Sequence, residues 1–198
     1  MTIYACSGNP GKLREFAVAA RLLGASDVSV KRLPESGVIS SPDETGTTFE
    51  ENAIMKAIYY SGFTPELVFA DDSGLAVDAL GGAPGVHSAR FAGPDATDAA
   101  NNRLLLERLE SASSRGARFV CVIAVAHAGR VLQIFRGTVE GRILHEPRGD
   151  GGFGYDPLFF YLPFKKTLAE VSAEEKFSVS HRGKALKAMV QWLKTLPT

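Results

Sequence analysis

The chain has 198 residues, of which 45% are hydrophobic, so it is long enough and apolar enough to form one sizeable packed domain. Its 22 Lys and Arg residues balance its 22 Asp and Glu residues, which argues against binding nucleic acid mainly through overall charge. Small anionic ligands remain compatible with this charge, because a local basic patch is enough to bind them.

No run approaches the ~18 apolar residues of a membrane span, and the N-terminus lacks the basic start and apolar middle of a signal peptide. The two cysteines, Cys6 and Cys121, lie in apolar runs without the spacing of a metal or redox motif. Buried thiols in a reducing compartment are the simplest interpretation. We therefore expect a cytoplasmic protein with no membrane or nucleic-acid partner.

Strand and helix patterns alternate along the chain. The first half predicts a strand over 3–6, a helix from Leu13 to Gly24, a strand over 28–33 and a loop over 34–46. A helix follows with Phe49, Ala53, Ala57 and Tyr60 on one stripe and a cap at Thr47 or Thr48, and after it come a strand over 67–70 and a short extended segment over 75–80. The second half predicts a helix over 98–110 capped by Asp95 or Thr97, strands over 119–126 and 131–139, and a final helix over 183–194.

The nearly all-apolar run 119–126 indicates a central strand covered on both faces. No internal repeat or linker interrupts the chain. We therefore expect one mixed α/β domain over residues 1–198, with two lobes around a groove.

Two adjacent carboxylates, Asp71 and Asp72, directly follow the apolar run 67–70. A buried strand does not usually end in paired carboxylates, because adjacent negative charges repel and lose water. A divalent cation would relieve both costs, and one carboxylate could also deprotonate an attacking water. The alternative is a turn in which these side chains bond to nearby backbone, but the apolar run favours a metal site. Glu44 and Glu51 are further acids that could reach the ion.

The loop over residues 7–12, SGNPGK, connects the first predicted strand with the first predicted helix. Free N–H groups and the dipole at a helix N-terminus attract phosphate, and Lys12 adds a positive charge. The loop is not a Walker A motif, because only two residues separate Gly8 from Gly11 and Leu13 follows the lysine. Taken alone, the loop fits an ordinary strand–helix turn equally well.

A second loop, GDGGFGYDP over residues 149–157, places four glycines around one aromatic side chain. Glycine lets the backbone approach a ligand closely, and Phe153 can stack on a flat ring. Asp156 can accept hydrogen bonds from a base or hold the loop. The alternative is a hairpin with Phe153 in the core, but a plain turn would not require so many glycines.

A donor-rich patch, KFSVSHRGK over residues 176–184, precedes the last predicted helix. Its cations, hydroxyls and imidazole suit phosphate and the carbonyl oxygens of a base. A basic cap on a surface helix is an equally good interpretation of this patch alone. The other histidines, His87, His127 and His145, lack metal-ligand spacing, and we expect them to be structural or exposed.

These motifs, together with FEENAIMKA and FADDSGLAVDALGGAPGVHSARFAG, occur in the order found in one family. From about Ile3 to Leu193 the sequence resembles the inosine triphosphate pyrophosphatases, which act on ITP, dITP and XTP. The resemblance implies an elongated mixed α/β fold with a long twisted sheet, flanking helices and two lobes around a central groove. It also implies a homodimer and Mg²⁺-dependent cleavage between the α- and β-phosphates, which gives a nucleoside monophosphate and pyrophosphate.

The resemblance further implies roles for single residues. Asp72 would be the general base and a metal ligand, with Glu44 as a second ligand and Asp71 as a supporting third. The substrate-binding residues would be Ser7, Gly8, Asn9, Pro10, Gly11 and Lys12 on the triphosphate, Ser73 beside them, Phe153, Gly154, Tyr155 and Asp156 on the base, and Lys176, His181 and Arg182 on base and phosphate. Lys56 would face either phosphate or solvent, and the glycine-rich stretch 81–85 would shape the groove or the dimer interface.

Selectivity would follow from hydrogen-bond polarity. Hypoxanthine and xanthine carry a keto oxygen at the 6-position, where adenine carries an amino donor. A site with donors such as Arg182 would form hydrogen bonds with the keto oxygen of hypoxanthine or xanthine, whereas the amino group of adenine would face other donors. Such an unpaired contact can favour the keto bases over adenine on the order of 10⁴-fold. Two other functions stay open: a related pyrophosphatase for modified pyrimidine or methylated nucleotides, and a non-catalytic nucleotide sensor. The retained Asp71, Asp72 and Lys12 speak against the sensor.

Overall fold

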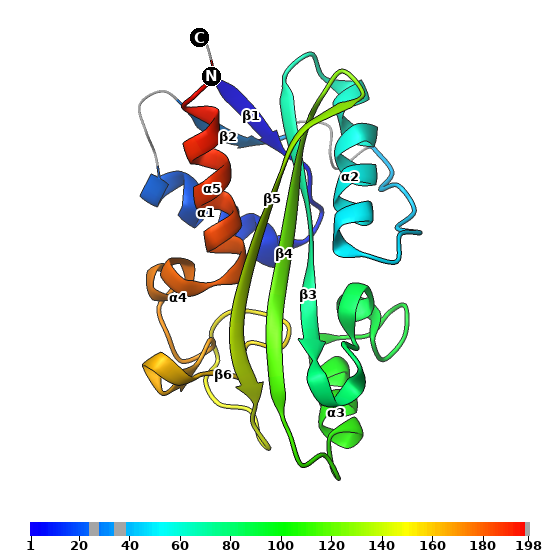
Figure 1. The fold of residues 1–198 in the computed structure, drawn as a ribbon, viewed down its shortest axis with the longest axis vertical. Helices are drawn as coiled ribbons and strands as arrows, with labels where there is room; N and C mark the ends of the chain where they lie inside the picture. Colours follow the sequence, from blue (N-terminus) through cyan, green and yellow to red (C-terminus); the bar gives the residue numbers. More distant parts are fainter. Residues whose placement is uncertain (24–27, 34–38, 197–198) are drawn as a thin grey trace.

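The computed structural model describes residues 1–23, 28–33 and 39–196. One seven-stranded mixed sheet, in the order β2-β1-β3-β4-β5-β6-β7, runs the length of the molecule (Figure 1). The strands are β1 (Thr2–Ala5), β2 (Ser29–Arg32), β3 (Leu67–Val77), β4 (Gly116–His127), β5 (Arg130–Ile143), β6 (Phe159–Tyr161) and β7 (Lys166–Thr167). β1 pairs in parallel with β2 and β3, and every later pair is antiparallel. The predicted fold class, an elongated mixed sheet flanked by helices, is confirmed.

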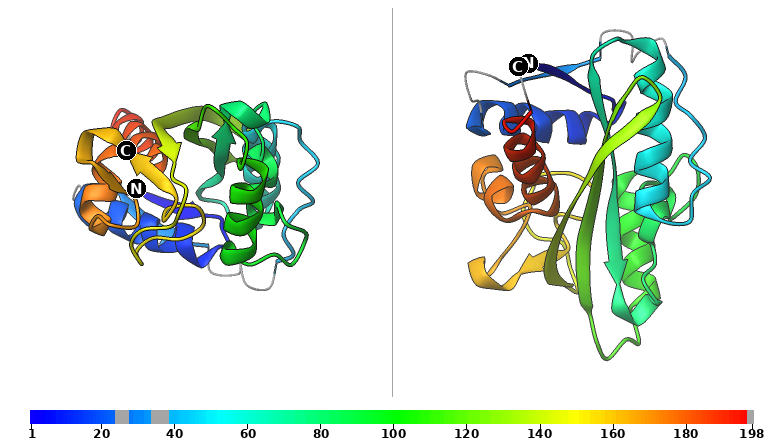
Figure 2. Two further views of the ribbon diagram at one scale, coloured as in Figure 1. Left: turned by 90° about the horizontal axis from the view of Figure 1, so that it is seen from below. Right: turned by 45° about the horizontal axis from the view of Figure 1, so that its top comes forward.

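Helices cover both faces of this sheet. Among the described residues they are α1 (Pro10–Leu23), α2 (Phe49–Tyr60), α3 (Asp98–Arg108), α4 (Ala173–Val179), α5 (His181–Leu193) and the short 3-10 helices η1 (Ser61–Phe63), η2 (Asp78–Leu80), η3 (Gly85–Arg90) and η4 (Leu162–Phe164). Figures 1 and 2 show α1, α4 and α5 on one side of the long strands and α2 and α3 on the other. No helix in the described part of the chain is long and apolar enough to cross a membrane.

The long strand β4 is central in the sheet, and its side chains alternate between two cores. Cys121 and Ile123 pack with α1 and α5, whereas Val122 and Ala124 pack with α2. Residues 119–126 are buried except for the partly exposed Val120, so the predicted central strand is confirmed. Cys6 and Cys121 are buried free thiols, also as predicted.

Local sequence signals place the helix that faces the site. The Thr48 hydroxyl accepts a hydrogen bond from Glu51 N at 3.1 Å, and the Glu51 carboxylate accepts one from Thr48 N at 3.1 Å. This reciprocal cap satisfies two N–H groups that would otherwise lack partners. α2 therefore begins at a defined point, with Asn52 and Lys56 on its buried face. Thr97 caps α3 in a similar way.

The predicted end of a strand at residue 70 is wrong. β3 continues to Val77 because the later residues pair with β4, Asp71 opposite Ile123 and Asp72 opposite Val122. The expected extended segment over 75–80 is accordingly divided between β3 and η2. The two carboxylates therefore lie in the middle of a strand and point to opposite faces of the sheet.

The start of the last helix and one further helix near the C-terminus also differ from the prediction. The last helix begins at His181 rather than Gly183, because the Ser180 hydroxyl accepts from Gly183 N at 3.0 Å and caps the helix earlier. Lys176, at the start of the donor-rich patch, lies in a separate short helix, α4, which the sequence patterns did not indicate. The predicted helix end at Gly24 and the start of the predicted loop at 34–38 fall outside the described residues.

Candidate active site

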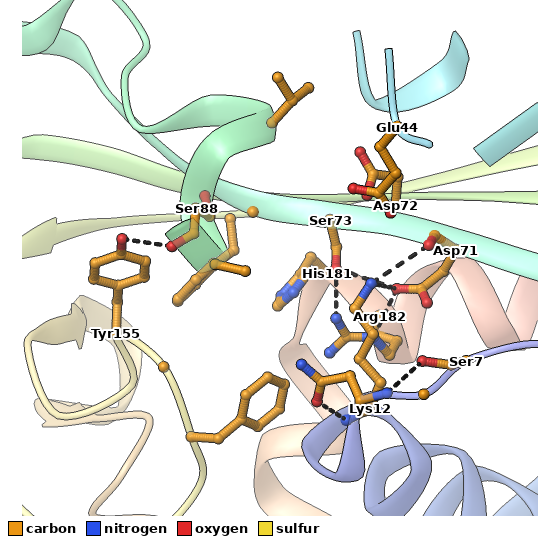
Figure 3. A pocket seen from close by; sticks show the side chains of 18 of the residues that line it. Ser7, Lys12, Glu44, Asp71, Asp72, Ser73, Ser88, Tyr155, His181 and Arg182 are labelled. Atoms are coloured by element: carbon orange, nitrogen blue, oxygen red, sulfur yellow. Dashed lines mark hydrogen bonds and ion pairs between the residues drawn. The ribbon is translucent and has the colours of Figure 1, made fainter. Parts of the chain in front are cut away.

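The candidate site lies along β3, at the point where the neighbouring strand β1 ends. β1 pairs with β3 only as far as Ala5 opposite Phe69, and the segment 83–88 contacts the same edge again only from Leu75, so the edge of β3 is open from Asp71 to Gly74. A cavity of about 340 Å³ runs along this open edge (Figure 3). Because the edge is uncovered, side chains from both faces of β3 line one cavity.

Of the residues to which the resemblance gives a catalytic, metal-binding or substrate-binding role, all except Pro10 and Gly11 line this cavity, whereas Glu51, the further acid expected to reach the ion, does not and instead caps α2. The lining residues among them are Ser7, Gly8, Asn9, Lys12, Glu44, Asp71, Asp72, Ser73, Phe153, Gly154, Tyr155, Asp156, Lys176, His181 and Arg182. Pro10 is the first residue of α1. Gly11 lies behind the Phe153 ring, where an added Cβ would come within 2.6 Å of the ring carbons.

The acidic side of the cavity is formed by Asp72 and Glu44, and both carboxylates form an ion pair with the ammonium group of Lys56. Lys56 Nζ lies 3.0 Å from Asp72 Oδ1 and 2.7 Å from Glu44 Oε1. Lys56, which the sequence left facing either phosphate or solvent, therefore points into the site. Arg90, which sequence reasoning missed, places Nη1 at 3.5 Å from Glu44 Oε2.

Burial and charge act against each other on these groups. Burial raises the pKa of Asp72 above its usual value, against the opposing pull of Lys56. Burial also acts to raise the pKa of Glu44, but the charge and hydrogen bond of Lys56 outweigh it and lower that pKa. For Lys56, burial lowers the pKa, but the Asp72, Asp71 and Glu44 carboxylates outweigh it and raise the pKa overall. Lys56 is therefore an ammonium held between carboxylates.

The donor set of the acidic side fits Mg²⁺. This ion is usually held by one or two protein carboxylates, with water and substrate phosphates as the other ligands. Asp72 and Glu44 already converge on one cationic atom, so they satisfy that requirement. Within the described residues, no three His, Cys, Asp or Glu side chains cluster as a metal site. Asp71, the third predicted ligand, faces the other side of β3, as Figure 3 shows.

The basic side of the cavity surrounds Asp71. Its Oδ2 atom lies 3.1 Å from Lys12 Nζ and 3.3 Å from Arg182 Nε. Ser73 Oγ donates to the same oxygen at 3.1 Å and accepts from Arg182 Nη2 at 2.6 Å. Burial acts to raise the pKa of Asp71, but Lys12 and Arg182 outweigh it and hold the pKa far below its usual range. Asp71 is thus a buried anion that fixes two cations in the cavity wall.

Glu15 on α1 is a second anion on this side, with a side chain only 17% exposed, and sequence reasoning missed it. Its carboxylate lies 2.6 Å from Lys176 Nζ and also pairs with Arg182. Burial acts to raise its pKa, but the Arg182 and Lys176 charges outweigh it and lower the pKa to about 2. The signal in the sequence was its spacing, because Glu15 lies one helical turn beyond Lys12 and shares its helix face.

Glu15→Gln is expected to remove pH-dependent stability. The folded pKa of about 2 lies below the ordinary value of 4.5, so the carboxylate stabilises the fold above pH 4.5. That stabilisation is lost as the pH falls towards 2. The free energy of unfolding in urea should therefore be lower in the variant by about 2–3 kcal/mol at pH 6–7, and the difference should vanish near pH 2.

The matched control for this measurement is Glu174→Gln. Glu174 pairs with Arg21 on the surface, so its ion pair is screened by solvent and little change in stability is expected. A Glu15→Gln effect of equal size at every pH would contradict the expected role of the Glu15 carboxylate.

The glycine-rich loop over 149–157, which is predicted to bind the base and is called the base loop below, is held in place by Asp156. Its buried Oδ2 atom accepts from Phe153 N at 2.8 Å and pairs with Lys176 Nζ. Burial raises the pKa of Asp156 despite the Lys176 charge. Gly152 has φ = 71°, and a Cβ there would come within 2.1 Å of Asp156 Oδ2, so this glycine is required. Of the two roles predicted for Asp156, holding the loop is the one seen in the hydrogen bonds.

Phe153 is partly exposed, with two cations near its ring. Lys176 Nζ lies 4.9 Å and Arg182 Cζ 5.7 Å from the ring centroid. His181 is buried and stacks on Phe119 at 4.8 Å between ring centroids. Burial lowers the pKa of His181 well below its usual value, and the Arg182 charge acts in the same direction. The imidazole is therefore neutral, and its buried Nδ1 lacks a hydrogen-bond partner among the described residues.

The glycine-rich stretch 81–85 supports one wall of the cavity. It folds back on the end of β3 through a hydrogen bond from Val77 N to Ala83 O at 3.1 Å. η3 follows it, and there Ser88 Oγ accepts from Leu75 N on the edge of β3 at 2.9 Å. Tyr155 Oη donates to Ser88 O at 2.8 Å. This wall therefore connects the strand with the base loop.

The structure is that of an α/β protein with an acidic and a basic side along one strand edge, next to the Phe153 ring, and these side chains are of the kinds that bind a cation, phosphates and a flat ring. The three donors around Asp71 and the convergent pair of Asp72 and Glu44 suit phosphate chemistry. The chain belongs to the Ham1 family, whose model matches residues 3–192. This membership confirms the resemblance suggested by the ordered motifs.

Individual relatives cover nearly the whole chain. It is 48% identical over 189 residues to a dITP/XTP pyrophosphatase of Exiguobacterium sp., which covers 96% of this chain and 95% of that protein. It is also 48% identical over 198 residues to a dITP/XTP pyrophosphatase of Desulforamulus reducens, with 99% and 97% covered. A solved structure of a HAM1 protein from Coxiella burnetii matches with a TM-score of 0.88 at 41% identity, over 99% of this chain and 100% of that one.

Proposed function

We propose that this protein is a nucleoside triphosphate pyrophosphohydrolase that acts on the non-standard purine nucleotides dITP, ITP and XTP. The products are the nucleoside monophosphate and pyrophosphate. One observation carries the proposal: a single cavity joins the carboxylates Asp72 and Glu44 to the phosphate loop over 7–12 and to the aromatic pocket of Phe153. The names of the relatives support the same substrate class.

The phosphate side of the reaction follows from the charges along β3. Asp72 and Glu44 would hold Mg²⁺, which when bound supplies a Lewis acid for the phosphate oxygens. Asp72 accepts the proton of the attacking water. Lys12, Lys56 and Arg90 stabilise the negative charge that builds on the departing pyrophosphate.

The loop over 7–12 is prepared for phosphate by its own hydrogen bonds. Asn9 Oδ1 accepts from Lys12 N at 3.1 Å, and Ser7 Oγ accepts from Asn9 N at 3.2 Å. These contacts orient the start of α1, so its remaining N–H groups and its dipole face the triphosphate. Asp71 supports this side by holding the Lys12 ammonium in the cavity wall.

The base is recognised by stacking and by donors. Phe153 stacks on the purine, while Lys176, Arg182 and backbone N–H groups donate to a 6-keto oxygen. Adenine would place an amino donor against the same donors, and this unpaired contact disfavours ATP. A homodimer of single-domain chains over residues 1–198, in the cytoplasm, belongs to the same proposal.

A substrate panel tests this function directly. With Mg²⁺, we expect dITP to give dIMP and pyrophosphate, with kcat/KM for dITP, ITP and XTP ~10²-fold or more above that for ATP. Removal of the divalent cation with EDTA should abolish turnover, and added Mg²⁺ should restore it. The measurement is pyrophosphate release with chromatography of the nucleotide product. Release of single phosphates, or preference for a pyrimidine triphosphate, would contradict the proposal.

A further inference from the structure

A buried amide on α2 connects the two carboxylates of the acidic side. Asn52 is 0% exposed and lies one helical turn before Lys56 on the same face of α2. Its Nδ2 donates to Asp72 Oδ2 at 3.3 Å, and its Oδ1 accepts from Gly46 N at 2.8 Å. Only the NH₂ group can donate to a carboxylate and only the oxygen can accept from an N–H group, so the two partners define the amide orientation.

The contact with Gly46 requires a close approach of the loop. A Cβ at position 46 would come within 2.6 Å of Asn52 Oδ1 and 2.8 Å of Glu51 Cβ. A larger residue would therefore push the loop away from α2. Glu44 lies two residues before Gly46, so this hydrogen bond anchors to α2 the loop that carries Glu44.

Asn52 and Lys56 together fix the orientation of the Asp72 carboxylate. Lys56 Nζ contacts Oδ1, whereas Asn52 Nδ2 contacts Oδ2. Residues four apart on a helix lie side by side, so both contacts come from one rigid surface. An apolar residue at position 52 would leave Asp72 Oδ2 and Gly46 N without this partner in a buried place.

We infer that Asn52 is a positioning residue that sets the separation and orientation of Glu44 and Asp72 as a pair for a divalent cation. The inference rests on the proposed function for its meaning in turnover, but the geometry of the pair is a property of the chain itself. Groups that hold metal-binding carboxylates in place affect metal affinity or activity ~10–100-fold when they are removed.

The competing explanation is that Asn52 only stabilises α2, and Ser61 provides a matched control. Ser61 is also a buried polar residue at the end of α2, and its Oγ accepts from Gly129 N at 2.9 Å and donates to Ile58 O at 2.7 Å. None of these partners belongs to the site. Ser61→Ala therefore removes buried hydrogen bonds near the same helix and leaves Asp72 and Glu44 untouched.

The test compares Asn52→Ala, Gly46→Ala, Ser61→Ala and the unaltered protein. Binding of Mn²⁺ alone is measured by water proton relaxation, Tm by thermal unfolding, and kcat and KM with dITP. For Asn52→Ala and Gly46→Ala we expect Mn²⁺ affinity to fall ~10-fold or more and kcat to fall ~10–100-fold, with KM for dITP changed less than about threefold. Ser61→Ala should lower Tm alone.

Wild-type Mn²⁺ affinity in Asn52→Ala, or an equal loss of affinity in Ser61→Ala, would overturn the inference. If Asn52→Ala does not fold, Gly46→Ala decides, because Gly46 lies in a surface loop and perturbs the same hydrogen bond from its other end. If the unaltered protein binds Mn²⁺ but does not hydrolyse dITP, the proposed function fails, and the Mn²⁺ comparison still decides the role of Asn52.

Discussion

Asp72→Asn is expected to lower kcat for pyrophosphate release at least ~10³-fold while the fold stays intact. The amide has the same shape as the carboxylate, so the packing between β3 and α2 is kept. It cannot accept the proton of the attacking water, and it removes one of the two negative charges that face Lys56 Nζ. The measurement is the rate of pyrophosphate release from dITP at saturating Mg²⁺, with thermal unfolding as the check on the fold.

The adjacent residue provides the control for this prediction. Asp71→Asn makes the same chemical change one position earlier, but on the opposite face of β3, where it leaves Lys12 and Arg182 without their shared anion. We expect it to lower stability clearly, because a buried charge pair broken on one side costs about 3–5 kcal/mol. More than a tenth of wild-type kcat in Asp72→Asn would show that another group activates the water.

Local sequence patterns, taken together with the family resemblance, were enough to select the loops that line the cavity. The phosphate loop over 7–12 and the base loop over 149–157 depend on glycine and on short-range hydrogen bonds, such as Asp156 with Phe153 N. The cap of α2 at Thr48 is equally local. Features of this kind can be predicted because the residues that create them are close in the sequence.

The central strand of the site could not be predicted in the same way. Asp71 and Asp72 belong to β3 because β4, about 50 residues later, pairs with them. The opposite directions of the two carboxylates follow only once that pairing is known. Asn52 lies inside an amphipathic helix, where a single polar residue cannot be distinguished by pattern from an ordinary surface position, and the spacing of Glu15 from Lys12 indicates its helix face but not its partners. Their partners lie on other elements, and only the fold identifies them.

Arg182→Met is expected to destabilise the fold strongly. The Arg182 side chain is 2% exposed, and its guanidinium contacts the carboxylates of Asp71 and Glu15 as well as Ser73 Oγ. Burial acts to lower its pKa, but Glu15 and Asp71 outweigh it and raise the pKa further above its usual value. Removing the cation leaves both carboxylates short of a partner, so unfolding in urea should show a loss of about 3–5 kcal/mol.

Two further variants separate charge from geometry. Arg182→Lys keeps the charge but cannot reach three partners in different directions, so it should recover only part of the lost stability. The double variant Glu15→Gln with Arg182→Met should be less destabilised than the sum of the single changes, because it removes one of the unpaired anions. Additive effects in this double-mutant cycle would mean that Glu15 and Arg182 are energetically independent. The expected coupling would instead show that the anions beneath the base pocket are there to hold its cations in place.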